Sequence, residues 1–411
     1  MSFTRDRQFY RFSSYGFLKN LRFFEPFIIL YFLEIGFSFL EIGVLFAIRE
    51  ISTVFFEVPT GLIADSKGRK VSMLFSMTAY IASFIVFFYF QEYFAAAGAM
   101  VLFACGEAFR TGTHKAMILE YLRLTGQTEW KPDYYGATRA ASNLGSALNA
   151  LIAAALVFIT GSFRYVFIAA VVPYVLNMIN LASYPSELDG TDVKNRPERA
   201  GIRDTFREFT SIFRRSDARM GILNSAVFDG FFKVLKEYLQ PVLKSLAISL
   251  PLLTAMQIDR RVAVVTGCVY FFLFLAASTA SRSAGKYCRR VKGVRKAVNS
   301  TWIAGFSLVI IAGIFYELSV FTVTIASYFV LFSIQNLRRP ICVTYISEKV
   351  PDRVMASGLS AESLLKMLVM TVLAPCAGYL ADRAGIGTAV ISAGVLMAVL
   401  YIPLRFRAAK L

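Results

Sequence analysis

The sequence has very little of the residues that metal and nucleophile chemistry uses. It holds one histidine, His114, and five cysteines. The cysteines form no C-x-x-C pair, so we expect no metal site and no disulfide. No P-loop, G-x-S-x-G or H-E-x-x-H motif is present either. We therefore expect no catalytic residues and no cofactor, in a protein that is not an enzyme.

Acidic residues are also scarce beside basic ones, with 27 Asp and Glu against 44 Lys and Arg and a net charge of +17. Such an excess can indicate a nucleic-acid partner. The distribution argues against one here, because the chain has a mean hydropathy of +0.57 and its apolar residues come in long blocks. We expect no nucleic-acid partner, and attraction of the basic residues to membrane lipid.

Twelve apolar blocks are long enough to cross a membrane as helices, which takes about 20 residues. They lie near 17–39, 42–65, 71–91, 94–118, 136–160, 163–184, 221–247, 259–281, 297–317, 319–347, 354–381 and 385–405. Most Lys and Arg residues fall in the two tails and in alternate loops. By the positive-inside rule, both termini are then cytoplasmic and the protein is a multi-pass protein of the plasma or inner membrane.

The longest polar stretch, residues 185–220, has six spans before it and six after it. We expect an all-α membrane protein with two pseudo-symmetric six-helix halves, 1–184 and 221–411. The stretch between them is expected to be a cytoplasmic linker, in which apolar residues at helical spacing within 201–215 predict an amphipathic helix on the membrane surface. Aligning the fourth span with the tenth, at an offset of 228 residues, matches Arg110 with Arg338.

Charges within the spans follow a period of three. Spans 3, 6, 9 and 12 hold essentially none, whereas spans 1, 4, 7 and 10 all carry several. Charged side chains in a bilayer must face protein or water, so these four spans are expected to line a wet interior. We count acids and bases within the spans as equal in number. The net charge therefore does not favour an anionic solute, although a purely apolar solute is disfavoured.

A short motif lies at the end of the second span. Its residues match the pattern G-x-x-x-D-x-x-G-R-[KR] and are Gly61, Asp65, Gly68, Arg69 and Lys70. With this motif, twelve spans and a central linker, the chain resembles the major facilitator superfamily over almost its whole length. The resemblance implies a transporter whose spans 1, 4, 7 and 10 line the cavity.

The motif residues have physical roles that fit gating of the cytoplasmic side. Gly61 allows close helix approach, and Gly68 permits a tight turn. Asp65 can cap a helix or pair with a base, and Arg69 can reach acidic groups or lipid phosphate. An ordinary polar turn is the alternative. The matching region of the second half, 284–293, has no Asp, so we expect an asymmetric latch.

In the fourth span, Glu107, Arg110 and His114 are expected on one helical face, at positions i, i+3 and i+7. Arg110 is a candidate to hold an anionic or polar group of a solute, and Glu107 a candidate proton carrier. Histidine titrates near neutral pH, so His114 can change charge during transport. The alternative is that Glu107 and Arg110 neutralise each other and that His114 is structural.

The other candidate cavity residues lie on spans 1, 7 and 10. Span 7 carries Asp229, Lys233 and Lys236 on one face, followed by Glu237, with which Lys236 can pair. Glu34 is expected deep in the first span, either as a proton site or as the partner of a base across the cavity. Arg338, in span 10, is the last candidate cavity residue. Glu362 and Lys366 in span 11 are expected to form a structural pair.

We therefore expect a secondary transporter, monomeric, that moves a small polar or charged solute by alternating access and is coupled to protons. Facilitated diffusion and exchange remain open. Two alternatives share the fold: an efflux antiporter of drugs or metabolites, and a membrane sensor that transports nothing. Span 5 lacks the Gly-Pro motif of many antiporters, and an intact Asp65–Arg69 latch is not needed in a protein that does not move.

Overall fold

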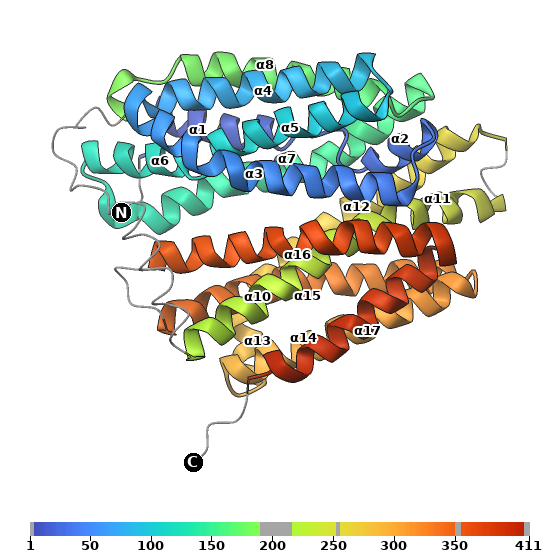
Figure 1. Cartoon of the computed structure of the whole chain (residues 1–411). Coiled ribbons are helices and arrows are strands. Elements are labelled where there is room, and N and C mark those ends of the chain that lie inside the picture. Colours follow the sequence, from blue (N-terminus) through green and yellow to red (C-terminus); the bar gives the residue numbers. More distant parts are fainter. Residues whose placement is uncertain (1–3, 190–215, 252–254, 350–354, 407–411) are drawn as a thin grey trace. The chain divides into compact units, whose positions relative to one another are not determined.

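The computed structural model describes residues 4–189, 216–251, 255–349 and 355–406 (Figure 1). This described part is helical and contains no strand, as expected for an all-α membrane protein. The expected amphipathic helix at 201–215 lies outside it.

Each of the first six predicted spans corresponds to a helix or to a pair of helices. They are α1 (Arg7–Lys19), α2 (Ile28–Glu34), α3 (Phe39–Lys67), α4 (Arg69–Tyr89), α5 (Tyr93–Arg110), α6 (Thr113–Leu124), α7 (Lys131–Thr160) and α8 (Tyr165–Ala182). A short 3-10 turn, η2 (Ser186–Asp189), follows α8.

The same holds for the last six predicted spans. They are formed by α10 (Ser216–Leu235), α11 (Leu239–Ser249), α12 (Ile258–Arg282), α13 (Ala284–Arg290), α14 (Val294–Glu317), α15 (Phe321–Lys349), α16 (Met355–Ala384) and α17 (Ile386–Leu404). Of these, α13 is a short helix between two longer ones.

Three predicted spans are interrupted, and the expectation of one continuous helix is wrong for each. The first breaks at residues 20–27, which include Pro26. The fourth breaks between α5 and α6, where Gly112 has φ 79°, a value that favours glycine. The seventh passes through the 3-10 turn η4 (Lys236–Tyr238) between α10 and α11. All three belong to spans that the charge pattern assigns to the interior, where broken helices are tolerated.

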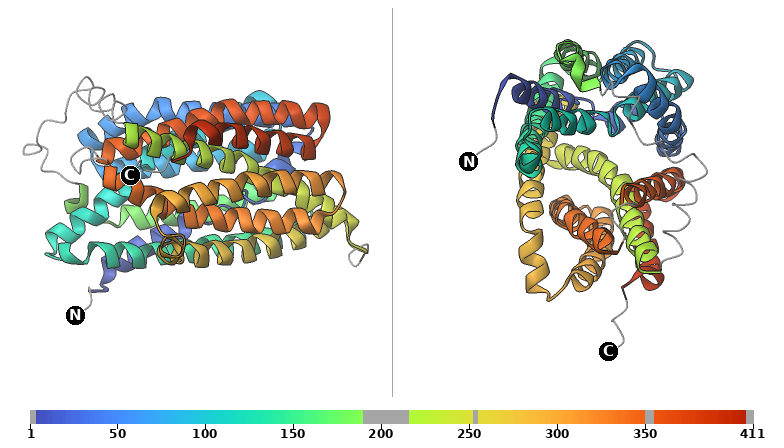
Figure 2. Two further views of the ribbon diagram at one scale, coloured as in Figure 1. Left: turned by 90° about the horizontal axis from the view of Figure 1, so that it is seen from below. Right: turned by 90° about the vertical axis from the view of Figure 1, so that its left-hand side faces the viewer.

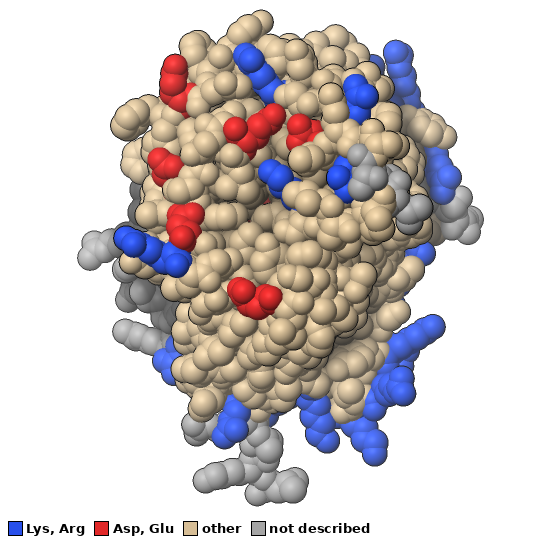
Figure 3. Space-filling model, turned by 90° about the vertical axis from the view of Figure 1, so that its right-hand side faces the viewer, with Lys and Arg blue, Asp and Glu red and all other residues tan. Residues whose placement is uncertain are grey.

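The outer surfaces of the helices are those of a membrane protein. Within the described residues, eight helices are long and apolar enough to cross a bilayer. Large apolar side chains point outward, such as Phe94, which is 87% exposed. Figure 3 looks onto one end of the helices, where acidic and basic side chains lie among uncharged ones.

The described chain forms two compact units. The first contains residues up to Ile35, the chain from Ile48 to the end of η2, and the beginning of α12 up to Phe271. In it α4 packs on α5 and α8, and α1 packs on α7 and α8 (Figure 2). The second contains the remaining described residues, with α14 packed on α15 and α17, and α10 on α16. The first part of α3 belongs to the second unit and the first part of α12 to the first.

In the second unit the first part of α3 is held tightly against α16. The backbone N–H groups of Phe39 and Leu40 each donate to the Asp382 carboxylate at 2.8 Å. A Cβ on Gly43 would collide with the Ala374 backbone, and one on Gly378 with the Phe39 backbone. The two helices therefore touch through glycine, as small residues allow in membrane proteins.

Candidate functional site

The first unit contains a cluster of ionised and hydroxyl side chains around Glu107, called here the Glu107 cluster. Arg110 Nη2 pairs with Glu107 Oε1, and Arg22 Nη2 pairs with Glu107 Oε2 at 3.1 Å. The Tyr80 hydroxyl donates to Glu107 Oε2 and accepts a hydrogen bond from Arg110 Nε at 3.4 Å. Both carboxylate oxygens are thus occupied by cationic or hydroxyl donors, which is the arrangement of a satisfied ion pair.

Arg22 reaches this cluster because the first span is broken. The α1 helix ends at Lys19, and the amide of Asn20 donates to the carbonyls of Gly16 and Ser142, which fixes the helix end on α7. In the irregular segment that follows, Arg22 Nε donates to the Tyr174 hydroxyl at 3.2 Å. That hydroxyl donates in turn to the carbonyl of Lys19 at 3.1 Å. The break therefore places a guanidinium beside Glu107.

His114 lies on the other side of the break at Gly112, on α6. The expectation that it shares one helical face with Glu107 is therefore wrong. Its ring stacks on the Tyr15 ring, with the centroids 3.7 Å apart, and its Nε2 lies 3.4 Å from the Tyr184 hydroxyl. These aromatic contacts favour the structural alternative for His114.

The count of equal acids and bases needs correction. It left out several charged residues that lie within the predicted spans, among them Lys19 and Arg22 in the first span. In the structure Lys19 interacts electrostatically with Arg110, Arg22 and Glu107. Three bases therefore gather around the Glu107 carboxylate, and the local balance of charge is positive. The first span alone would not have revealed this excess, because its two bases, Lys19 and Arg22, are matched in number by Glu25 and Glu34.

The second unit holds two carboxylates with neutral partners. The Gln335 amide donates to Asp229 Oδ1 at 2.7 Å, and the Ser225 hydroxyl donates to Glu362 Oε1 at 3.2 Å. Glu362 interacts electrostatically with Lys366, as predicted, although no salt bridge within 4 Å joins the two among the described contacts. Glu362 also interacts electrostatically with Asp229 and with Arg339, so charges of both signs surround it.

The remaining candidates are placed as follows. Lys236 pairs with Glu237 at 3.3 Å, as predicted, and Lys233 lies half-buried in the last turn of α10. Glu34 is the last residue of α2 and is exposed. The expectation that it lies deep in the first span is wrong, because that span ends five residues earlier than predicted.

Arg338 is 0% exposed, so the expected role in a solute cavity is not supported by its position. Its Nη1 donates to the Val298 carbonyl at 2.7 Å and to the Thr301 hydroxyl at 2.9 Å. Its Nη2 donates to Asn224, and the guanidinium lies over the rings of Phe228 and Trp302, 4.4 and 5.2 Å from their centroids. The side chain is enclosed within its own unit.

The motif at the end of the second span forms the turn between α3 and α4. Gly68 has φ 97°, and the N–H of Lys70 donates to Asp189 Oδ1 at 2.5 Å. Asp189 belongs to η2, so a residue 119 positions later in the sequence caps the start of α4. The sequence did not suggest this partner. No described atom lies within 4 Å of a Cβ built on Gly61, so close helix approach is not seen there.

The side chains of two motif residues, Arg69 and Lys70, reach backbone carbonyls outside the turn. Arg69 Nη1 lies 3.5 Å from the carbonyl of Ala116, and Lys70 Nζ donates to the Tyr184 carbonyl at 3.0 Å. Asp65 lies in the last turns of α3, and its side chain is outside the described part. A gating role for the motif therefore remains a prediction.

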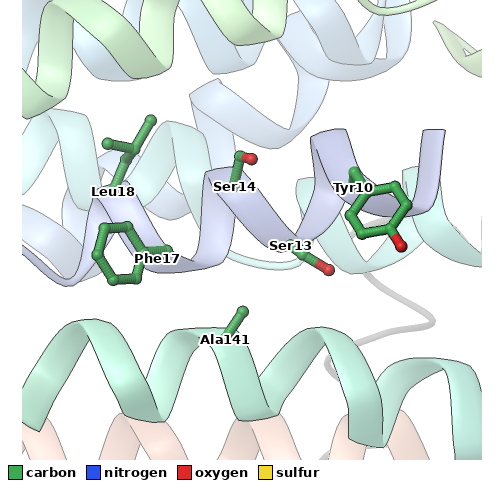
Figure 4. A pocket seen from close by; sticks show the side chains of 6 residues that line it. All are labelled: Tyr10, Ser13, Ser14, Phe17, Leu18 and Ala141. Carbon is green, nitrogen blue, oxygen red and sulfur yellow. The ribbon is translucent and has the colours of Figure 1, made fainter. Parts of the chain in front are cut away.

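A shallow cavity of about 300 Å³ lies between α1 and α7 (Figure 4). It is lined by Tyr10, Ser13, Ser14, Phe17, Leu18 and Ala141. None of these side chains is charged, and the buried Ser13 hydroxyl has no hydrogen-bond partner among the described residues. This cavity is therefore distinct in chemistry from the Glu107 cluster.

The chain is similar to known proteins of a single family. A model of the Major Facilitator Superfamily matches residues 17–367. The uncharacterized MFS-type transporter YxaM of Bacillus subtilis (strain 168) is 33% identical over 107 residues, which cover 26% of this chain and 26% of YxaM. The alignment therefore spans about a quarter of that relative's length.

Solved structures agree over nearly the whole chain. The nucleoside transporter NupG superposes with a TM-score of 0.75 and 12% identity, covering 98% of both chains. The D-xylose-proton symporter superposes with a TM-score of 0.70 and 15% identity, again covering 98% of both chains. At such identities the likeness shows the fold alone.

Proposed function

Because the chain belongs to the major facilitator superfamily and is an integral multi-pass membrane protein, we propose that it is a proton-coupled secondary transporter of a small polar or charged solute. It would work by alternating access between two sides of the membrane. The main observation in support of proton coupling is the hydrogen bond between Asp229 and Gln335. A structural neighbour, the D-xylose-proton symporter, is by its name coupled to protons, which supports the class of mechanism and no more.

Asp229 suits a proton carrier because its charge can change without breaking an ion pair. It is 7% exposed, and in the described part of the chain its hydrogen-bond partner is the neutral Gln335. An amide can present either its N–H or its carbonyl. The Gln335 carbonyl is buried and accepts no hydrogen bond from a described residue. After rotation of the amide it can accept the proton of a neutral Asp229, so Gln335 satisfies both forms.

Glu107 is less suited to this role, although the sequence makes it a candidate proton carrier, as it does Glu34. Its two oxygens accept from Arg22, Arg110 and Tyr80. Protonation would leave two guanidinium groups without their counter-ion inside the unit, which is costly in a medium of low dielectric. We assign Glu107 the role of counter-ion rather than of proton carrier.

The test uses purified protein in liposomes that enclose a pH-sensitive dye. Organic anions, amino acids, sugars, chelates resembling siderophores and cationic drugs are added one at a time. We expect one compound to move protons, and Asp229→Asn to abolish proton movement while the labelled compound still equilibrates. The matched control is Asp217→Asn at the exposed start of the same helix, which should behave as the wild type.

Two results would count against the proposal. If Asp229→Asn still moves protons with the solute, the carrier is another group. If no compound moves protons and no labelled compound equilibrates, the result favours the alternative of a membrane sensor that transports nothing. The direction of solute movement, measured in the same vesicles, decides between uptake and efflux.

We also propose that the protein is a monomer in the plasma or inner membrane, with both termini in the cytoplasm. The support is the concentration of Lys and Arg in the tails and alternate loops. A single cysteine introduced in either tail of a variant without the native cysteines should react with a membrane-impermeant reagent only after the cells are opened.

A further inference from the structure

We propose that Lys19, Arg22 and Arg110 form a binding site for an oxyanion group of the solute, a carboxylate or a phosphate. This inference rests on the proposed transport function and names the chemical class of its solute. It is carried by three features of the first unit: its local charge, its unused hydrogen-bond donors, and the exposure of its guanidinium groups.

The local charge is positive whichever acids are counted. Lys19, Arg22 and Arg110 face Glu107, and Lys19 and Arg22 also interact with Glu25. Even with both acids included, one positive charge remains in excess. Lys19 is repelled by the two arginines, so an anion bound among the three would relieve an unfavourable interaction. In a medium of low dielectric such terms are several times larger than in water.

The unused hydrogen-bonding groups are all donors. Glu107 engages Nη2 of both arginines, while Nε of Arg22 donates to Tyr174 and Nε of Arg110 to Tyr80. Nη1 of Arg22 and Nζ of Lys19 meet no acceptor among the described residues, whereas Arg110 also forms a side-chain hydrogen bond with Tyr15.

A hydroxyl adds a further donor beside these nitrogens. The Tyr15 hydroxyl is buried beside Arg110, accepts a side-chain hydrogen bond from it, and keeps its own O–H as a donor. Carboxylate and phosphate oxygens offer acceptors only. A group of that kind matches the set of free donors, whereas the hydroxyls of a sugar would also need acceptors and a cation would be repelled.

The guanidinium groups are within reach of a solute. The side chains of Arg22 and Arg110 are 18% and 19% exposed, and that of Glu107 is 26% exposed. Planar guanidinium groups bind carboxylate and phosphate through two parallel N–H donors. Arg338 in the second unit offers no comparable surface, because it is fully buried.

The test measures binding separately from transport. Purified wild-type protein in detergent is heated in rising concentrations of succinate, inorganic phosphate, glucose and choline, with ionic strength held constant by sodium chloride. We expect succinate or phosphate, but neither glucose nor choline, to raise the melting temperature in a saturable way. Comparison of the two anions shows whether the site takes a carboxylate or a phosphate.

Variants of Lys19 link the effect to the proposed site, since this side chain is not part of an ion pair whose loss would unfold the protein. Lys19→Gln should raise the half-saturating anion concentration at least about tenfold, and Lys19→Arg should restore it. Lys286→Gln, an exposed lysine on α13, serves as the control and should bind as the wild type.

Several outcomes would overturn the inference. They are saturable stabilisation by glucose or choline alone, no saturable stabilisation by either anion, and wild-type anion affinity in Lys19→Gln. Failure of the transport proposal looks different. Proton movement driven by a neutral solute leaves the transport function standing and removes the oxyanion site. Anion binding without any transport leaves the site and removes the transport function.

Discussion

Arg110 and Arg338 occupy matching positions in the two halves of the sequence, yet their surroundings differ. Arg110 pairs with the Glu107 carboxylate and remains partly exposed. Arg338 is fully buried, is held by backbone carbonyls and neutral side chains, and lies over two aromatic rings. In one site the positive charge faces an ion and is partly exposed. In the other it is distributed over dipoles and aromatic faces.

The difference shows that an arginine inside a membrane span does not by itself mark a solute site. What decides is whether a solute can reach the guanidinium group, and Arg338 is fully buried. Arg338 donates to Val298, Thr301 and Asn224 and connects α10, α14 and α15. Its removal should therefore affect stability most, whereas changes around Arg110 should affect binding more than folding.

The largest effect is expected for Arg338→Met. The change leaves several buried acceptors without a donor, which should cost roughly 3 kcal/mol of unfolding free energy or more. Thermal unfolding in detergent measures it, and Arg339→Met, at the exposed neighbour on the same helix, is the control. A variant with an unchanged melting temperature that fails to transport would mean that Arg338 contacts the solute in another conformation.

A smaller loss is expected for Glu107→Gln. Arg22, Arg110 and Lys19 would lose a counter-ion, and unfolding free energy should fall by roughly 2 kcal/mol. Solute-driven proton uptake should persist, because Asp229 is the proposed carrier. Glu120→Gln removes another Glu–Arg pair of the same i, i+3 spacing, in which Arg123 is 60% exposed, and should cost less than about 1 kcal/mol. If a fully stable Glu107→Gln protein loses solute-driven proton uptake, Glu107 and not Asp229 is the proton carrier.

The smallest effect is expected for Tyr80→Phe. It deletes one hydroxyl that donates to Glu107 and accepts from Arg110, and should cost about 1 kcal/mol. Tyr89→Phe, an exposed tyrosine at the end of the same helix, should change nothing in the same unfolding experiment. Equal stability of the two variants would show that the ion pairs hold Glu107 without help from Tyr80.

The fold could be predicted from the sequence because a bilayer imposes long apolar blocks, and these correspond to helices throughout the described chain. The breaks could not be located in this way. Hydropathy reports which residues are apolar, but not where the backbone turns. Pro26 and Gly112 stood in the sequence, yet such residues are also tolerated within continuous membrane helices, as Pro173 is in α8.

The site could be predicted only in part. Helical spacing identified the contact of Glu107 with Arg110, because both residues lie on one helix. Arg22, Tyr80 and Tyr174 come from other elements, and nothing in the spacing shows which faces of separate helices meet. Gln335 was overlooked beside Asp229 for the same reason, and the deeply buried Arg338 was mistaken for a cavity residue.

The break at Gly112 also determines how far the charges lie from the water. The stretch Tyr93–Leu124 has 32 residues, and as one straight helix it would extend about 48 Å, against a hydrocarbon thickness of about 30 Å. A helix that enters the hydrocarbon at Tyr93 has crossed it by Gly112. His114 and Lys115 then lie at the level of the lipid headgroups, and Arg110 lies within one helical turn of them. The ionisable groups of Glu107, Arg110, His114 and Lys115, although close together, are thus compatible with a spanning segment.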